Sequence, residues 1–136
     1  MANEADTKPT SLDLLSTLVA KAMKAGASAA DAVTSNGVSL SVTQRLGKRE
    51  DLERAEGTDL GLRVFMGKQQ AMVASTETSE QAMDELVSRA LSMAKAAPED
   101  PYCGLVDPGQ LMTTALPDLD LLDPSEPDGE ALYARA

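Results

Sequence analysis

Two stretches of the chain carry apolar residues at spacings of three and four, the pattern of amphipathic helices. The first runs from Thr10 to Ala25. Thr10 and Asp13 have the spacing of a capping box, although Glu or Gln is more usual at the second position. Gly26 lies where a left-handed C-terminal cap is expected. The apolar stripe consists of Leu12, Leu15, Leu18, Val19, Ala22 and Met23.

The second helical stretch follows Thr78 and Gln81, which also have capping-box spacing. Its end is predicted before Pro98, because proline disfavours the α conformation of the residue that precedes it. Its stripe consists of Met83, Leu86, Val87, Ala90, Leu91 and Ala94, which we interpret as core; Met83 then fills space between helix and sheet. Neither helix can bury such a stripe alone.

Between the helices the apolar period falls to two, as expected for strands. Asn36-Gly37 is the strongest short hairpin signal, because a type I′ turn needs positive φ at both central positions. It predicts that Asp31–Ser35 pairs with Val38–Arg45. Val38, Leu40 and Val42 would then share one face of a half-buried strand.

Two further turns are predicted downstream. One at Gly47-Lys48 leads into a charged strand, Arg49–Ala55, and Gly57 then interrupts the pattern. The other, at Gly67-Lys68, joins the alternating residues 60–66 to a last strand, Gln70–Ser75. The predicted fold class is therefore α+β, with two helices packed on one face of a mainly antiparallel four-stranded sheet in the order α-β-β-β-β-α.

The predicted domain organisation has three parts: a disordered N-terminus over residues 1–9, an α+β domain over 10–97, and an extended C-terminal tail over 98–136. Six of the seven prolines and nine acidic side chains lie in this tail, opposed only by Arg135. We interpret it as an acidic linker or strap that leads to a missing downstream domain. Residues 132–136 resemble the opening of another helix.

Charge and composition narrow the function classes. A net charge of −10 repels phosphate backbones, so direct nucleic-acid binding is disfavoured. No run of 18 apolar residues and no signal-peptide pattern is present, which predicts a cytoplasmic protein without a membrane segment. The chain has no histidine, which removes Ser-His and Cys-His pairs and His-bearing zinc sites.

Three groups of residues invite a chemical interpretation, and each has a plainer one. Cys103 could be a reactive thiol, but no basic residue lies near it in sequence, so an ordinary loop cysteine is favoured. Asp118, Asp120 and Asp123 lack the glycine and terminal Glu of an EF-hand, so a solvated acidic loop is favoured. The glycine cluster matches no phosphate-binding motif and is assigned to turns or bulges: Gly57, Gly61 and Gly67. No catalytic, cofactor-binding or metal-binding residue is assigned.

Several motifs, in order, resemble the TldD/PmbA family. The central one is residues 59–68 followed by 71–76 and the helix beginning at Ser79. Residues 24–32 resemble the family's helix-to-strand entry, and residues 96–105 and 117–124 look like the linker of its PmbA branch. The resemblance covers about residues 12–128, with Met72 a departure where the family often has glycine.

The resemblance implies a soluble bacterial member of a zinc metallopeptidase family that matures peptides, degrades proteins and is also named a modulator of DNA gyrase. TldD-like members carry a His-Glu-x-x-x-His zinc motif in a later domain, whereas PmbA-like members commonly lack it and pair with a TldD-like subunit. No position in this chain matches those ligands, so the fragment is expected to be neither catalytic nor a cofactor binder; zinc would belong to the full-length protein or its partner subunit. The expected partners are a TldD-like subunit or a second copy, and a peptide substrate in the full complex.

Two function hypotheses follow. The first is a structural and assembly domain of a peptidase complex. The alternative is a stand-alone module that binds a peptide or protein on an exposed sheet edge. The sequence downstream of this chain would discriminate between them.

Overall fold

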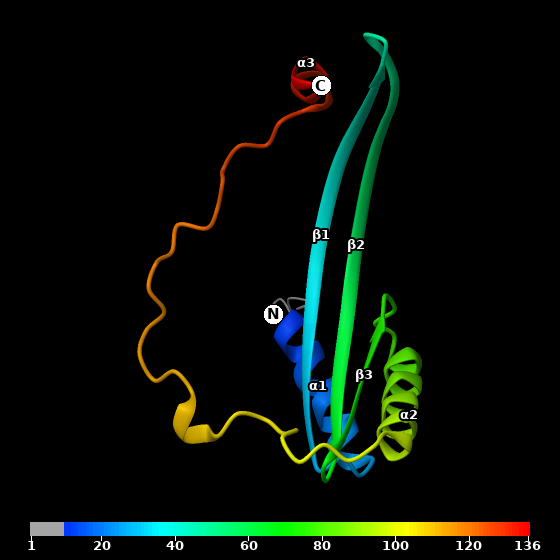
Figure 1. The fold of residues 1–136 in the computed structure, drawn as a ribbon, viewed down its shortest axis with the longest axis vertical. Helices are drawn as coiled ribbons and strands as arrows, with labels where there is room; N and C mark the ends of the chain where they lie inside the picture. Colours follow the sequence, from blue (N-terminus) through cyan, green and yellow to red (C-terminus); the bar gives the residue numbers. More distant parts are fainter. Residues whose placement is uncertain (1–9) are drawn as a thin grey trace, which may run out of the picture. The chain divides into compact units, whose positions relative to one another are not determined.

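The structure, a computed structural model, describes residues 10–136; the N-terminus predicted to be disordered, residues 1–9, lies outside the described residues. Three strands form one sheet in the order β1-β2-β3 (Figure 1). The elements in chain order are α1 (Ser11–Lys24), β1 (Ala29–Arg45), β2 (Lys48–Met66), β3 (Gln69–Ser75), α2 (Glu80–Ala96), the 3-10 turn η1 (Pro108–Gln110) and α3 (Gly129–Arg135).

The prediction of a four-stranded sheet with two helices is wrong, although the α+β class holds. Asn36-Gly37 is not a turn, because β1 runs through it as one strand of 17 residues. Gly37 is not among the positive-φ glycines. The turn predicted at Gly47-Lys48 is present one residue earlier, at Leu46-Gly47, with φ of 51° and 72°. Gly57 likewise interrupts nothing, since β2 continues through it for 19 residues. The segments predicted as separate strands before β3 thus form one long hairpin of two strands, β1 and β2.

Capping contacts and Gly26 explain where α1 begins and ends and where α2 begins. In α1 the predicted capping box is confirmed: the Asp13 N–H donates to Thr10 Oγ1 (3.2 Å) and the Thr10 N–H donates to Asp13 Oδ2 (2.9 Å). Gly26, just past the helix, has φ +106°. In α2 the predicted Thr78 box is wrong, since the cap is Ser79, whose Oγ accepts from the Ala82 N–H at 3.2 Å.

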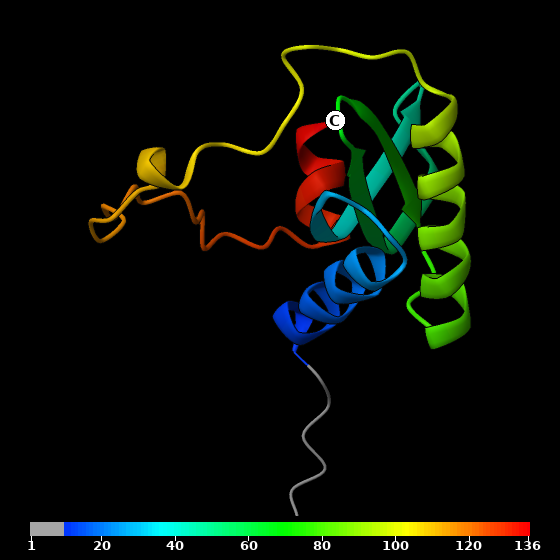
Figure 2. The same cartoon turned by 90° about the horizontal axis from the view of Figure 1, so that it is seen from below.

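The chain divides into two compact units, described here within residues 10–136. The core unit comprises residues up to 36 and 58–105; the arm unit comprises 37–57 and 106–136. In the core unit, Leu60, Leu62 and Val64 alternate along β2 and are fully buried beneath both helices (Figure 2). The cluster is completed by Leu18, Ala22, Ala27, Ala30, Val73, Met83, Leu86, Val87, Ala90, Leu91 and Ala94.

The opposite sheet face of the core unit is more polar. Arg63 pairs with Asp31, and its guanidinium lies 5.2 Å from the ring centroid of Phe65, which is 1% exposed. The chain after α2 is fastened at the β2-β3 turn, where the Asp100 N–H donates to the Lys68 carbonyl at 2.8 Å. None of the helices within the described residues has the length and apolar character needed to span a membrane.

Candidate functional site: the hairpin arm and helix α3

The arm, residues 37–57 of the β1-β2 hairpin, contains no fully buried residue. A two-stranded ribbon of this kind is only marginally stable in water without a further layer. On β1 three alternate side chains are half-buried, Leu40, Val42 and Gln44, and they mark the covered face of the ribbon. The alternation predicted for Val38, Leu40 and Val42 is therefore present in part, with Val38 64% exposed.

Helix α3 docks on the arm through one arginine and one tyrosine. The Arg49 guanidinium donates to both carboxylate oxygens of Glu130, and it lies 4.6 Å from the ring centroid of Tyr133. The Tyr133 hydroxyl donates to the Asp51 carbonyl at 2.6 Å, and Gln44 Nε2 donates to the Tyr133 carbonyl. Both strands of the arm thus hold the same helix.

The electrostatics of this contact follow from its hydrogen bonds. Donation from Arg49 lowers the pKa of the Glu130 carboxyl, because the charged form accepts both bonds. The same bond raises the pKa of Arg49. At the start of α3, a Cβ placed on Gly129 would lie 2.8 Å from Leu52 Cδ1, so the helix approaches the arm closely there. The arrangement builds a contact surface and contains no group placed for chemistry.

No local pattern in the sequence indicates this contact. Arg49 and Glu130 are 81 residues apart, and each by itself looks like an ordinary surface charge. The last helix of the tail packs on the arm of the same chain, whereas the docking of the tail on a downstream domain or partner stays a prediction. The tip residue Leu46 was also missed, although it is 95% exposed in a left-handed conformation.

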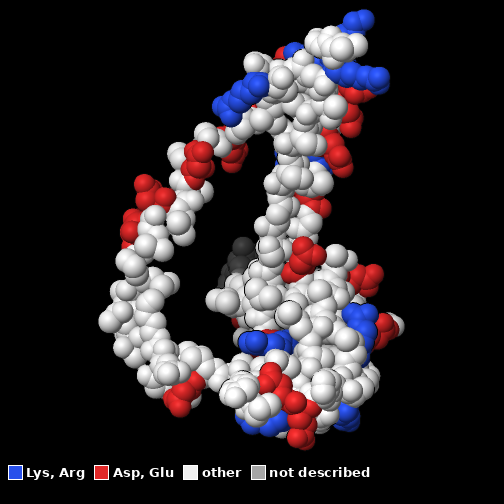
Figure 3. All heavy atoms as spheres, viewed as in Figure 1, with Lys and Arg blue, Asp and Glu red and all other residues white. Residues whose placement is uncertain are grey.

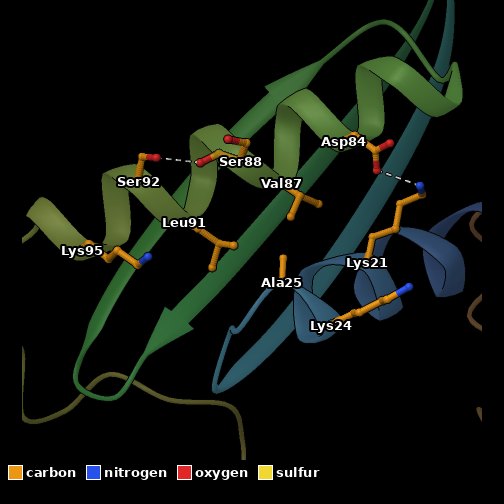
Figure 4. Close-up of a pocket in the computed structure, with 9 residues that line it drawn as sticks. All are labelled: Lys21, Lys24, Ala25, Asp84, Val87, Ser88, Leu91, Ser92 and Lys95. Carbon is orange, nitrogen blue, oxygen red and sulfur yellow. Dashed lines mark hydrogen bonds and ion pairs between the residues drawn. The ribbon is translucent and has the colours of Figure 1, made fainter.

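A groove between α1 and α2 is the other hollow of note (Figure 4). Its charged wall is already paired, since Lys21 Nζ lies 2.7 Å from Asp84 Oδ1 and 3.4 Å from Glu80 Oε1. Those bonds, chiefly the one to Asp84, raise the pKa of Lys21. Lys24 and Lys95 stand in the last turns of their helices, where cations complement the helix dipole. We interpret the groove as a structural seam between helices.

The residues singled out by sequence are not brought together. Cys103 is buried, and its carbonyl accepts from Lys68 Nζ at 3.3 Å, a cation that sequence proximity had not indicated. The tail aspartates are exposed; Asp118 accepts from the Asp120 N–H and Asp123 from the Ser125 N–H, which accounts for local turns. Of the glycines, Gly67 has φ +64° in a turn, Gly61 lies against Val33, and Gly57 lies within β2; Met83 is core.

A zinc site does not fit the residues present. Among residues 10–136 no group of three His, Cys, Asp or Glu side chains could hold a metal ion, and the whole chain has no histidine. Tetrahedral zinc sites are built mainly from His and Cys. We therefore assign this chain no step that involves a metal.

Comparison with known proteins places the fold in a family. A family model described as PmbA/TldA metallopeptidase domain 1 matches residues 30–94. The chain is 39% identical over 107 residues to a metalloprotease PmbA homolog from Haemophilus influenzae, covering 79% of this chain and 23% of that protein. It is 33% identical over 97 residues to metalloprotease PmbA from Escherichia coli O157:H7, covering 71% of this chain and 21% of that one.

Two crystal structures share the fold. One is named as a modulator of DNA gyrase, from Bacteroides thetaiotaomicron, with a TM-score of 0.71 and 17% identity. The other is TldE from Thermococcus kodakarensis, with a TM-score of 0.64 and 16% identity. Each match covers 82% of this chain and 25% of the other, so this chain spans about a quarter of these proteins. Together with the sequence matches, they show that the chain belongs to the TldD/PmbA family and carries that family's first domain.

Proposed function

We propose that this chain is a non-catalytic assembly domain of a TldD/PmbA-type metallopeptidase of the cytoplasm, and that the arm makes its subunit contacts. The partner is a TldD-like subunit or a second copy, and any zinc and peptide chemistry belongs to the rest of the assembly. The family membership supports the metallopeptidase context. The observation that carries the assembly role is the arm itself.

Ordering the arm costs conformational free energy that the arm recovers only if it is buried against another molecule. Strands β1 and β2 run on through residues 37–57, where no side chain is fully buried, so this ribbon adds little apolar burial to the fold. It still requires ordering of 21 backbone residues, counted from 37 to 57, at about 1 kcal/mol or more each. Large apolar side chains remain exposed along it, including Val38, Leu46 and Leu52. An element with this profile is suited to burial against another subunit.

The experiment shortens the arm in the full-length protein that contains this domain. Residues 37–56 are replaced by Asn-Gly, which favours a type I′ turn, keeps the pairing register of β1 and β2 and leaves the core cluster intact. We expect the mass measured by light scattering to fall to that of separated subunits, while the core unit still unfolds cooperatively. The control is Leu12→Gln, which changes a 74% exposed residue on α1. An unchanged assembly mass in the arm-shortened protein would contradict the proposal.

A second candidate rests on β3, which is an edge strand of the sheet. Its outer edge runs along Gln69–Ser75, where Met72 is 70% exposed and the Ala74 carbonyl accepts from Arg89 Nη2 at 3.1 Å. An extended peptide could add there as a fourth strand. Proline at position 72 would block such pairing, because it has no N–H to donate. Met72→Pro should therefore abolish peptide binding at β3 while the arm still supports assembly.

A further inference from the structure

The tip of the arm holds a leucine where the backbone disfavours it. Leu46 and Gly47 form the two central positions of the turn, with φ of 51° and 72°. Turns of this type favour Asn-Gly, because a bulky Cβ is crowded in the left-handed region. The side chain of Leu46 is 95% exposed, so it gains nothing from the fold in return. A strained and fully exposed apolar residue is a candidate for contact with another molecule.

Cations surround this leucine. Arg45, Lys48 and Arg49 flank the turn. Figure 3 shows blue atoms gathered at the arm end, with red atoms close by along the arm. Arg45 approaches Glu50 at 3.9 Å and Arg49 is held by Glu130. Lys48 forms no ion pair within residues 10–136. The matching surface is therefore apolar and acidic.

The tail of the arm unit has that composition. Residues 118–123 read Asp-Leu-Asp-Leu-Leu-Asp, and all six are exposed. Leu119, Leu121 and Leu122 are 63%, 85% and 81% exposed. This acidic leucine segment combines three apolar side chains with three carboxylates. The tip offers Leu46 and Lys48, the one tip cation without an ion pair within residues 10–136, since Arg45 and Arg49 already face Glu50 and Glu130. The two surfaces are complementary in charge and alike in apolar content.

We propose that the arm tip docks onto the acidic leucine segment, residues 118–123, of a second copy of the chain. Within one copy the two surfaces stay exposed, with Leu46 and Leu121 both more than four-fifths accessible. A two-fold pair of copies forms the contact twice, tip to segment in each direction. This inference rests on the assembly role proposed above and names the contact and the partner for it.

The first test is a variant that improves the turn and removes the anchor. Leu46→Asn installs the Asn-Gly pair that the turn favours, so the chain should fold at least as well as the parent. Sedimentation equilibrium should show self-association weakened by about tenfold or more, because burial of one leucine is worth at least that factor. Leu12→Gln, the matched control, should associate like the parent. Equal association of Leu46→Asn and parent, or a parent that stays monomeric throughout, would overturn the proposal.

A charge exchange tests the partner. Lys48→Glu and Asp118→Lys should each weaken self-association, since each places like charges at both contacts. An equimolar mixture of the two variants should associate again, because each tip then meets an opposite charge on the other copy. If the mixture does not regain self-association, the second-copy assignment is wrong. It is also wrong if the parent chain binds anionic lipid vesicles through Lys48 and does not self-associate. Shortening the arm in the full-length protein tests the assembly role independently, because that experiment does not depend on residues 118–123.

Discussion

Leucines 62 and 52 lie on the same strand, β2, and the structure gives them opposite roles. Leu62 is fully buried in the core cluster, whereas Leu52 is 54% exposed on the arm. Leu62→Ala should destabilise the chain by about 2–5 kcal/mol, from lost apolar transfer and a residual cavity. Leu52→Ala should change stability by about 0.5 kcal/mol or less, as for other surface sites.

Thermal unfolding followed by circular dichroism separates the two outcomes. In a domain of this size 1 kcal/mol shifts Tm by roughly 4–8 °C, so Leu62→Ala should lower Tm by at least about 8 °C. Leu52→Ala should stay within about 4 °C of the parent by the same conversion. The substitution and the strand are the same, so β-propensity cancels in the comparison. Equal shifts for the two variants would refute the division of β2 into a core half and an arm half.

Three further predictions concern the hairpin, a helix cap and α3. Gly47→Val should cost about 1–2 kcal/mol, because Gly47 has φ +72°, whereas Gly37→Val should cost little, since nothing lies within 4 Å of its added Cβ; urea unfolding of both variants checks this. Ser79→Ala should cost about 1 kcal/mol and Thr78→Ala much less, because Ser79 caps α2; a larger loss for Thr78→Ala would restore the discarded capping box. The lowered pKa of Glu130 means that α3 docking is stabilised above the ordinary Glu value of 4.5 and is lost as pH falls through the lowered one; the Leu132 amide resonance should report this loss, and Glu130→Gln should remove its pH dependence.

Apolar periodicity predicted both helices of the core unit, because it depends on residues within one or two turns. Cap spacing predicted the start of α1, but it placed the cap of α2 at Thr78, one residue before the actual cap, Ser79. The strands were harder, for a reason visible at two positions. Asn36-Gly37 has the strongest local turn signal, but pairing along the whole of β1 and β2 keeps it extended. A turn was predicted at Gly47-Lys48, but the chain turns one residue earlier, at Leu46-Gly47, although leucine is a poor residue for positive φ. Long-range pairing decided both positions over local propensity.

The contact between α3 and the arm could not have been predicted from sequence. A short helix was indicated near residue 132, and α3 is present at Gly129–Arg135. The surface on which α3 packs was not indicated. Arg49 and Glu130 are 81 residues apart in the sequence, and only the folded chain brings them together. What sequence did indicate correctly was the family, whose motifs lie mostly in the core unit.

Amide hydrogen exchange of the arm tests the assembly role most directly, since it compares the same residues in the isolated chain and in the full-length assembly. Residues 37–57 form a ribbon with no fully buried side chain, so they should exchange fast in the isolated chain once it is diluted until it is monomeric. They should become strongly protected in the assembly, while Leu60, Leu62 and Val64 are protected equally in both and serve as the internal reference. Arm amides that exchange at the same rate in the isolated chain and in the assembly would contradict the claim that this arm is the domain's subunit contact.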